Sequence, residues 1–344
     1  MEIKKEMKAW VKKKGVDGLV KVMLPVPEVK PDEILVKVKA VGICGTDMGI
    51  YAGYRDVPEG LVPGHEFCGE VVKIGDRVKG YELGDLVTPG IIINCGSCWS
   101  CHNGFEAQCD NLQEIGIHRD GAFAEYVVFP ATAAHKLPKD YSLVKAASIE
   151  PVAVAYNIVK KIDDICLDKD VIVFGPGPIG LYCAQLLMNM GFRNVIMVGT
   201  RESRLKVARQ FGAKTVNINE EDLFESCRKY VGDKGAEIAI EATGNPNAIN
   251  DALELLSAHG QLVLAGIFHK PVSMGLFEMI RKESSISTAF CYTWTDYEHA
   301  TQMMINDKIN IDDIVTHVMP LDDMDNAVSL IKSRQAIKVV LTND

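Results

Sequence analysis

Residues 171–190 read VIVFGPGPIGLYCAQLLMNM, and this stretch is the strongest indication of the fold class. A short, uniformly apolar run, VIVF, is followed by a turn that contains three glycines and then by a longer apolar run that starts at Ile179. The short run predicts a strand buried on both faces, and the longer run predicts a helix. Strand, glycine turn and helix in this order form the first part of a βαβ crossover, so we expect a parallel sheet.

The turn has the spacing Gly175-x-Gly177-x-x-Gly180, with Pro178 and Ile179 between the last two glycines. An isolated match is weak evidence, but this one directly follows a predicted strand and opens a predicted helix. The first glycine permits a tight turn, the second lets a pyrophosphate approach the backbone, and the third lets the helix pack on the strand. These five residues are therefore candidate dinucleotide contacts, the alternative being glycines that serve only the turn.

The residue that separates NAD from NADP binding is expected about twenty residues beyond this loop, at the end of the second strand. The chain reads VIMVGTRESR over 195–204, so Gly199 occupies the usual acidic position and is followed by Thr200 and Arg201. Glycine leaves room for a 2′-phosphate, a hydroxyl can donate to it, and a guanidinium can pair with it in a bidentate manner. We therefore favour NADP(H). NAD(H) is the alternative if Arg201 is only a solvated residue at a helix start.

The alternation of strand and helix patterns continues from this segment towards residue 290. Apolar runs follow at 195–198, 236–242, 261–266 and 285–290, and helical patterns such as NAINDALELLS (247–257) lie between them. Strands that are uniformly apolar and separated by amphipathic helices predict a doubly wound parallel sheet covered on both faces. We place this α/β domain at residues 155–288.

The remainder of the chain has a different pattern. Short β-type runs separated by Gly, Pro and Asp occur at 34–43, 67–75, 85–93 and 124–129, and the strand-like IKVVL closes the chain at 337–341. This pattern predicts an irregular β-rich domain. The predicted organisation is a β-rich domain of residues 1–154 and 289–344 that is interrupted by the α/β domain.

Length and charge narrow the functional classes. A chain of 344 residues suggests two domains, and a net charge of −9 argues against nucleic acid as a partner, because neutralising phosphates needs a basic face. The sequence contains no run of the roughly eighteen apolar residues that a membrane span requires, and its N-terminus does not resemble a secretory signal. We therefore expect a cytoplasmic protein that does not bind membranes.

Four of the ten cysteines crowd into the segment CGSCWSCHNGFEAQC. Cys95, Cys98, Cys101 and Cys109 have the spacing Cys-x2-Cys-x2-Cys-x7-Cys, and four thiolates on one short lobe suit a closed, structural zinc site. Bacterial ferredoxins share the first two spacings, but their fourth cysteine follows after three residues and precedes proline. Here seven residues intervene and Asp110 follows, so we favour zinc.

A second possible metal set is dispersed along the chain. Cys44 follows an apolar run, His65 and Glu66 follow a Pro-Gly turn, and Glu150 interrupts an otherwise apolar stretch. A buried carboxylate needs a partner or a metal. One thiolate, one imidazole and one or two carboxylates leave a zinc coordination position free for water or substrate, which is the catalytic pattern.

These motifs together resemble the zinc-dependent medium-chain dehydrogenase/reductases, and within them the sorbitol (polyol) and threonine dehydrogenase branch. The segments that carry the resemblance span nearly the whole chain: GICGTD (42–47), GHEFCGEV (64–71), GDRVKGYELGDLV (75–87), the four-cysteine lobe, the Glu150-Pro151 step, the glycine-rich loop and EATGNP (241–246). The resemblance implies a GroES-like catalytic domain with an inserted Rossmann domain. It also implies dimers or tetramers.

The resemblance further implies that Cys44, His65 and a carboxylate hold the catalytic zinc. Related branches differ on whether that carboxylate corresponds to Glu66 or Glu150, and we expect both to lie at or directly behind the metal. Thr46 matches the hydroxyl that hydrogen-bonds the zinc-bound alcohol in the family, although it could merely cap its own backbone. Many relatives place a proton-relay histidine where this chain has Gly49, so the resemblance does not identify the group that carries the proton out of the site.

The implied function is the NAD(P)-linked oxidation of a secondary alcohol to a ketone. The ligand set favours a polyol, sugar acid or diol, because a vicinal oxygen can supply a second zinc ligand. An enzyme similar to L-threonine 3-dehydrogenase is the alternative. A non-catalytic zinc-binding regulator would lack the second metal set, and a zinc-independent reductase of the same superfamily would lack the Cys44 and His65 equivalents. Metal content distinguishes these classes. The dehydrogenase would hold two zinc ions per chain, the regulator one, and the zinc-independent reductase none.

Overall fold

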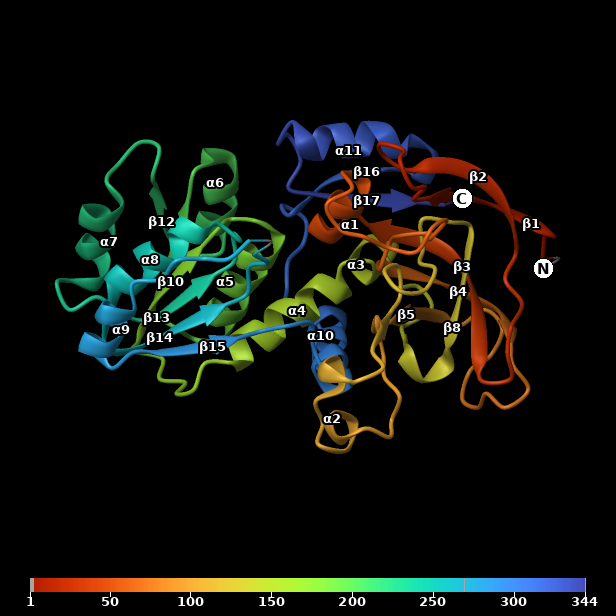
Figure 1. Cartoon of the computed structure of the whole chain (residues 1–344), viewed down its shortest axis with the longest axis horizontal. Helices are drawn as coiled ribbons and strands as arrows, with labels where there is room; N and C mark the ends of the chain where they lie inside the picture. The colour runs from red at the N-terminus through yellow and green to blue at the C-terminus, as the bar shows by residue number, and fades with distance from the viewer. Residues whose placement is uncertain (1–2, 269, 344) are drawn as a thin grey trace. The chain divides into compact units, whose positions relative to one another are not determined.

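The computed structural model describes residues 3–268 and 270–343, which divide into two compact units (Figure 1). The first unit extends to Glu150 and resumes at Thr293, and the second unit is Pro151–Tyr292. Helix α4 (Ile149–Lys160) starts in the first unit and continues into the second. The boundaries predicted from the sequence were 154/155 and 288/289.

The second unit contains a parallel sheet of six strands. In spatial order these are β12 (Lys214–Asn217), β11 (Asn194–Gly199), β10 (Asp170–Phe174), β13 (Ala236–Glu241), β14 (Leu256–Leu264) and β15 (Ser285–Thr288). The chain runs outward from β10 to β12 and then returns to β13, so the strand order reverses beside β10. This is the Rossmann arrangement, in which ligands bind outside the carboxyl ends of the strands at the reversal point.

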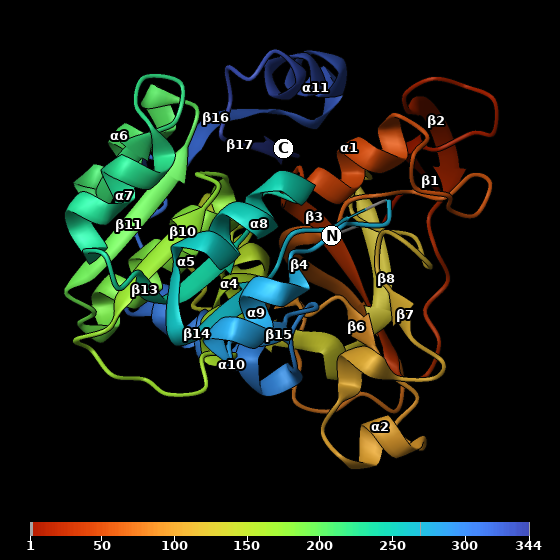
Figure 2. The same ribbon diagram turned by 60° about the vertical axis from the view of Figure 1, so that its left-hand side comes forward.

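The helices of the second unit form two groups. Helices α5 (Pro178–Met190) and α6 (Glu202–Gln210) contact each other, while α8 (Pro246–Leu255) contacts both α7 (Leu223–Val231) and α9 (Leu276–Lys282). Figure 2 shows the sheet from a direction in which these helices can be followed. Apolar residues of α7 and α8, among them Val231 and Ile249, pack against Ile172 of β10 and Ile196 of β11. The strands are uniformly apolar because helices cover both faces of the sheet, and the predicted fold class is confirmed.

The first unit is built around a sheet of seven strands. The main path is β16 (Val315–Pro320), β17 (Lys338–Thr342), β3 (Glu33–Gly42), β4 (Glu66–Ile74), β5 (Leu86–Pro89) and β9 (Ala134–Lys136), with β8 (Tyr126–Pro130) paired to β3. Two small two-stranded sheets accompany it: β1 (Glu6–Val11) with β2 (Val20–Pro25), and β6 (Ile92–Ile93) with β7 (Gln113–Glu114).

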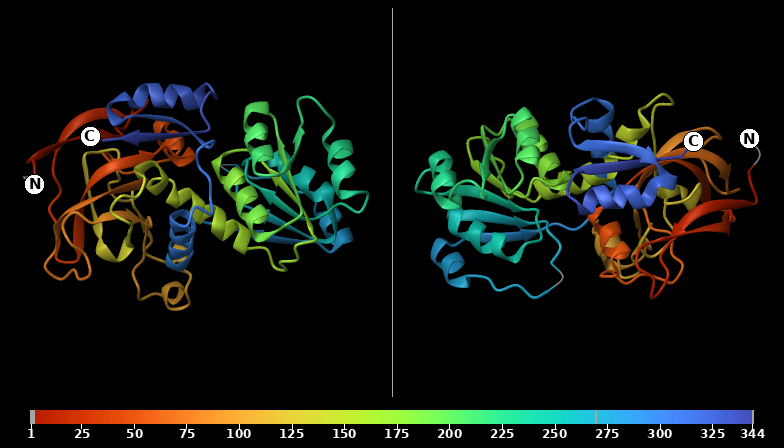
Figure 3. Two further views of the ribbon diagram at one scale, coloured as in Figure 1. Left: turned by 180° about the vertical axis from the view of Figure 1, so that it is seen from behind. Right: turned by 90° about the horizontal axis from the view of Figure 1, so that it is seen from above.

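The first and last parts of the chain meet in this sheet. Strand β17 runs antiparallel to β3, with Leu341 opposite Val41, so the tail completes the unit that the N-terminal part begins (Figure 3). The short helices of the unit are α1 (Gly45–Tyr51), α2 (Trp99–His102) and α3 (Leu143–Ala146), and the longer ones are α10 (Trp294–Ile305) and α11 (Met324–Lys332). Across the described residues, no helix is long and apolar enough to cross a membrane.

Candidate metal centres and dinucleotide site

Cys44, His65 and Glu66 converge in the first unit. Cys44 immediately precedes α1, and His65 and Glu66 stand at the start of β4. One ligand atom from each of the three residues lies within 4.8 Å of the others. The register explains the convergence, because Gly42 at the end of β3 pairs with Glu66 and Cys44 follows two residues later. A thiol, an imidazole and a carboxylate in this space are a donor set that zinc takes.

Asp47 organises this cluster from behind. Its carboxylate accepts hydrogen bonds from the backbone N–H of Cys44 at 2.8 Å and of Gly64 at 3.3 Å, and it lies 3.5 Å from Nδ1 of His65. Burial lowers the pKa of His65, whereas the negative charges of Asp47 and Cys44 raise it, and the net pKa is well above the ordinary value. A site that favours positive charge on its imidazole this strongly also favours a bound cation. Asp47 was not among the site residues expected from the sequence, although its position three residues after Cys44 is the spacing of a capping box.

Glu66 forms an ion pair with Lys338 of β17, and both side chains are almost fully buried. The Lys338 ammonium also donates to the backbone oxygen of Ile43 at 3.0 Å. Burial lowers the pKa of Lys338, but the charges of Glu66 and Cys44 outweigh that effect and raise it. The lysine is therefore charged and holds the carboxylate beside the other two donors. No motif in the sequence indicated Lys338.

The other residues expected at this centre have different positions. Glu150 is buried in the first turn of α4 and lies outside the group formed by Cys44, His65 and Glu66. Thr46 is half-buried in the first turn of α1, and Gly49 lies one turn further along the same helix. Thr46 follows Cys44 by two residues, because α1 begins directly after that cysteine.

The four cysteines of the lobe form a second compact group. Their sulfurs are 3.4 Å apart for Cys98 and Cys101, and 3.9 Å apart for both Cys95–Cys101 and Cys98–Cys109. A tetrahedron with Zn–S bonds of about 2.3 Å has S–S edges of about 3.8 Å, so the arrangement fits a closed four-sulfur zinc site. The four ligand atoms all lie within 4.8 Å of one another.

Hydrogen bonds inside the lobe favour thiolates at some of these positions. Bonds from Ser97, through its hydroxyl and its backbone N–H, lower the pKa of Cys95 to about 5. The Cys109 sulfur accepts from the backbone N–H groups of Cys95 and Asn111, both at 3.3 Å, but desolvation and the neighbouring thiols of Cys95 and Cys101 raise its pKa to about 11. A metal must bind the deprotonated thiol, so backbone donors arranged in this way prepare the lobe for a cation.

The glycine-rich loop lies at the carboxyl end of β10 in the second unit. Gly175 has φ +100°, a conformation that glycine adopts without strain. A Cβ on Gly177 would meet nothing within 4 Å, whereas one on Gly180 would lie 2.0 Å from the Gly175 oxygen. These surroundings match the three expected roles: the tight turn, the open approach for a pyrophosphate, and the close helix packing. Pro178 and Ile179 open α5, whose amino end faces this loop.

Gly199 ends β11 next to this loop. A Cβ there would lie 2.5 Å from Cγ of Pro176, so the packing of the loop itself requires glycine at this position. Thr200 is exposed, and Arg201 caps the start of α6 in a half-buried position. The position therefore has a steric reason for lacking a side chain, which the sequence alone did not indicate.

Glu241 shapes the adjacent loop. This fully buried carboxylate at the end of β13 accepts from the backbone N–H of Thr243 at 2.7 Å and of Gly244 at 3.1 Å. The Thr243 methyl would in turn be 2.6 Å from a Cβ on Gly175. Glu241 thus supports the edge of the sheet where the reversal of strand order predicts a ligand. Sequence reasoning did not identify it as a site residue.

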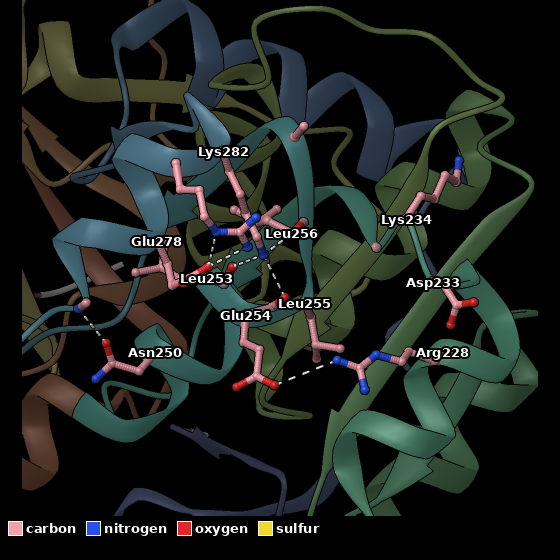
Figure 4. Close-up of a pocket in the computed structure, with 14 residues that line it drawn as sticks. Arg228, Asp233, Lys234, Asn250, Leu253, Glu254, Leu255, Leu256, Glu278 and Lys282 are labelled. Carbon is pink, nitrogen blue, oxygen red and sulfur yellow. Dashed lines mark hydrogen bonds and ion pairs between the residues drawn. The ribbon is translucent and has the colours of Figure 1, made fainter.

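The second unit also has a cavity of about 660 Å³ near the amino ends of β13 and β14 (Figure 4). Several of its charged side chains already have partners. The Lys282 ammonium donates to the backbone oxygens of Leu253, Glu254 and Leu256 at 2.7–2.8 Å, and Arg281 pairs with Glu278 at 2.7 Å. None of the site residues predicted from the sequence lines this cavity.

Comparison with known proteins gives a consistent result over the whole chain. Residues 30–139 match the alcohol dehydrogenase GroES-like domain, and residues 178–306 match the zinc-binding dehydrogenase family. An L-threonine 3-dehydrogenase of Shewanella putrefaciens is 32% identical over 343 residues, which cover 98% of this chain and all of that protein.

Two solved structures have the same fold throughout. A putative zinc-binding dehydrogenase from Sinorhizobium meliloti, bound to NADP, has a TM-score of 0.93 at 30% identity and covers 99% of this chain and 100% of its own. A short chain alcohol dehydrogenase from Escherichia coli CFT073, complexed with NADH, has a TM-score of 0.92 at 29% identity with the same coverage. The chain belongs to the zinc-dependent medium-chain dehydrogenase/reductase family. It is an oxidoreductase of the alcohol dehydrogenase type.

Proposed function

We propose that this protein oxidises a secondary alcohol to a ketone at a zinc ion held by Cys44, His65 and Glu66. The hydride would pass to a nicotinamide dinucleotide bound at the glycine-rich loop. The observation that carries the proposal is the convergence of a thiol, an imidazole and a carboxylate within 4.8 Å in a chain of this family. Non-catalytic regulators need only a structural lobe, so a complete second donor set favours an enzyme.

Zinc with one sulfur, one nitrogen and one oxygen ligand keeps a position open and supplies a Lewis acid that lowers the pKa of an alcohol hydroxyl. The chain's own residues prepare that site. Asp47, beside Nδ1 of His65, orients the imidazole so that its other nitrogen is available as a ligand. Lys338 pairs with Glu66 and holds its carboxylate in place.

The roles of the remaining predicted residues follow from their positions. We assign the ligand role to Glu66 in preference to Glu150, because Glu150 lies outside the three-residue group. Glu150 would then act as a second carboxylate behind the metal. Thr46 would hydrogen-bond the substrate hydroxyl from the first turn of α1. Gly49 supplies no imidazole, so the proton would leave directly to solvent or through another group.

The four-cysteine lobe would hold a second, structural zinc ion. The S–S distances of 3.4–3.9 Å and the bonds that favour thiolates support this assignment. Because four sulfurs fill a tetrahedral shell, the lobe has no position for substrate. The proposed metal content of the enzyme is therefore two zinc ions per chain.

NADP(H) is the proposed cofactor, with NAD(H) as the alternative. Gly199 places no carboxylate against a 2′-phosphate, and Arg201 lies two residues further along. The family structures described above include one bound to NADP and one complexed with NADH, so both cofactors fit this fold.

The proposed substrate class is a polyol, sugar acid or diol, whose vicinal oxygen can supply a further zinc ligand. L-threonine is the second candidate. It is favoured by the 32% identity with an L-threonine 3-dehydrogenase over nearly the whole chain. Both candidates carry a secondary hydroxyl next to a second polar group, and only a substrate panel separates them.

We also propose a cytoplasmic homo-oligomer. Helix α9 exposes Phe277 and Ile280, each 74% accessible, and β15 is an edge strand of the second unit's sheet. Exposed apolar side chains beside an open sheet edge are typical of a surface that a second copy covers. Reduced thiols suit the cytoplasm, because the metal lobe requires them. Sedimentation of the wild type and of Phe277→Asp tests the assembly.

The decisive experiment compares the wild type with Cys44→Ser on a panel of polyols, sugar acids, diols and threonine, with NAD and NADP in parallel. We expect turnover in the wild type and none in Cys44→Ser, with unchanged cofactor binding and one fewer zinc ion per chain. Turnover that persists in Cys44→Ser contradicts the catalytic assignment. If Arg201→Ala leaves the preference between NADP and NAD unchanged, the 2′-phosphate assignment is wrong.

A further inference from the structure

A buried hydrogen bond joins helix α10 to the central sheet of the first unit. The hydroxyls of Tyr297 and Thr88 are 2.6 Å apart, and both residues are completely buried. Thr88 belongs to β5, and Tyr297 lies in the first turns of α10, more than 200 positions later in the chain. The large majority of buried side-chain polar atoms in folded proteins have a hydrogen-bond partner, and each of these hydroxyls has one.

The direction of the hydrogen bond between Tyr297 and Thr88 follows from the second hydrogen bond that Thr88 makes. The Thr88 hydroxyl donates to the backbone oxygen of Phe67 at 2.9 Å. A hydroxyl has one proton, so Thr88 must accept from Tyr297. Burial raises the pKa of Tyr297 well above its ordinary value, so the phenol keeps the proton that it donates. The chain of bonds therefore runs from Tyr297 to Thr88 and ends on the backbone of β4.

Phe67 is the residue directly after His65 and Glu66. Strands β4 and β5 pair through Gly69 with Val87 and Glu70 with Leu86, so the ladder stops before it reaches the ligand residues. At Phe67 the Thr88 hydroxyl takes the place of a backbone partner. The start of β4, which carries two of the proposed zinc ligands, is thus tied to β5 by a side chain.

Several contacts hold Tyr297 in position. Its ring lies 4.7 Å from the ring of His135, which is the register partner of Thr88 in the neighbouring strand β9. The first turn of α10 is closed by a capping box between Thr293 and Asp296. The backbone N–H of Trp294 donates to Glu106 of the four-cysteine lobe at 2.8 Å. The ring contact and the anchored start of α10 together hold the tyrosine beside Thr88.

We propose that Tyr297 is a positioning residue for the catalytic metal: through Thr88 it fixes the Phe67 carbonyl and thereby the placement of His65 and Glu66. This inference rests on the proposed zinc site. It predicts that removal of a hydroxyl which touches neither metal nor substrate loosens the metal, because the ligands lose their preset geometry. Partners behind metal ligands commonly affect metal affinity about 10- to 100-fold, and we expect about tenfold here.

The test uses Tyr297→Phe and Thr88→Val, which remove the hydroxyls with little change in volume, and Thr88→Ser, which keeps one. The control is Tyr141→Phe in the same unit, because the Tyr141 hydroxyl is buried without a hydrogen-bond partner among the described residues. The readout is the rate at which purified holoenzyme releases zinc to a chelator. The phase of release that comes from the catalytic site is the one that is absent in Cys44→Ser.

We expect the catalytic phase of zinc release to be about tenfold faster in Tyr297→Phe and Thr88→Val, near wild type in Thr88→Ser, and unchanged in Tyr141→Phe. The lobe phase should be the same in all of them. A Tyr297→Phe variant that releases zinc no faster than Tyr141→Phe overturns the inference alone. A wild type without a phase that depends on Cys44 overturns the proposed function instead.

Discussion

Replacing Lys338 by methionine should destabilise the metal-free first unit by about 3–5 kcal/mol. The side chains of Lys338 and Glu66 are 3% and 2% exposed, and the pair has no access to bulk water that could screen a lone charge. Methionine keeps the apolar stem of the lysine but leaves the carboxylate buried without a counter-charge. Breaking a buried pair by removing one partner costs about 3–5 kcal/mol.

The assay is urea unfolding of the chelator-treated protein, followed by tryptophan fluorescence. All three tryptophans of the chain, Trp10, Trp99 and Trp294, belong to the first unit, so the signal reports on that unit. With zinc bound, the Glu66 carboxylate has a cation beside it, and the loss in Lys338→Met should be smaller. A difference between the metal-free and zinc-bound measurements is part of the expected result.

Two further variants test whether the unpaired Glu66 carboxylate causes the loss of stability. Adding Glu66→Gln to Lys338→Met removes the unpaired charge and should recover most of the lost free energy of unfolding. Lys8→Met is the control, because Lys8 pairs with Asp322 at 3.1 Å where both side chains are about half exposed, and such pairs contribute under about 1 kcal/mol. A Lys338→Met variant that loses no more than Lys8→Met, or a double variant that recovers nothing, refutes the argument.

Three other predictions concern acid and packing. Protons compete with zinc for thiolates, so acid should release the lobe zinc, which a zinc-sensitive dye detects in Cys44→Ser; a lobe zinc content that does not respond to acid would contradict thiolate ligation. Burial lowers the pKa of His135 below 6.5, so on acidification the imidazole is protonated in the unfolded chain before it is protonated in the folded chain. The free energy of unfolding should therefore fall as the pH drops below 6.5, and His135→Phe should flatten that decline. An identical pH profile of stability in His135→Phe would refute the lowered pKa. In Gly180→Ala the new Cβ meets the Gly175 oxygen, a strain that should lower the free energy of unfolding by about 1–3 kcal/mol in urea unfolding followed by circular dichroism, and an unchanged stability would disprove the close packing.

Local sequence patterns were enough to predict the Rossmann unit and to propose the metal lobe. The run 171–190 carries strand, turn and helix in one stretch, and the cysteines of the lobe lie within fifteen residues of each other, so short-range geometry determines both. The set of Cys44, His65 and Glu66 was inferred through resemblance, and the structure brings these three together because Gly42 and Glu66 are register partners.

The residues that sequence reasoning missed act across long separations. Lys338 reaches Glu66 only because β17 pairs with β3, and Tyr297 reaches Thr88 only because α10 packs on β5. Neither belongs to a motif, since the partner is supplied by the tertiary fold. Asp47 is the exception, because its spacing from Cys44 was visible in the sequence. For Glu150, burial was foreseeable, but its place outside the group of Cys44, His65 and Glu66 was not.

The contact between Gly199 and Pro176 constrains how this lineage can exchange one cofactor preference for another. An aspartate at 199 would force its Cβ against the proline ring before its carboxylate could meet a ribose. Substitution at 176 must therefore come first, and selection for cofactor preference would not reward that step by itself. The order of mutations, more than their number, then governs access to the alternative preference, and an engineer who grafts the acidic residue alone will meet the same barrier.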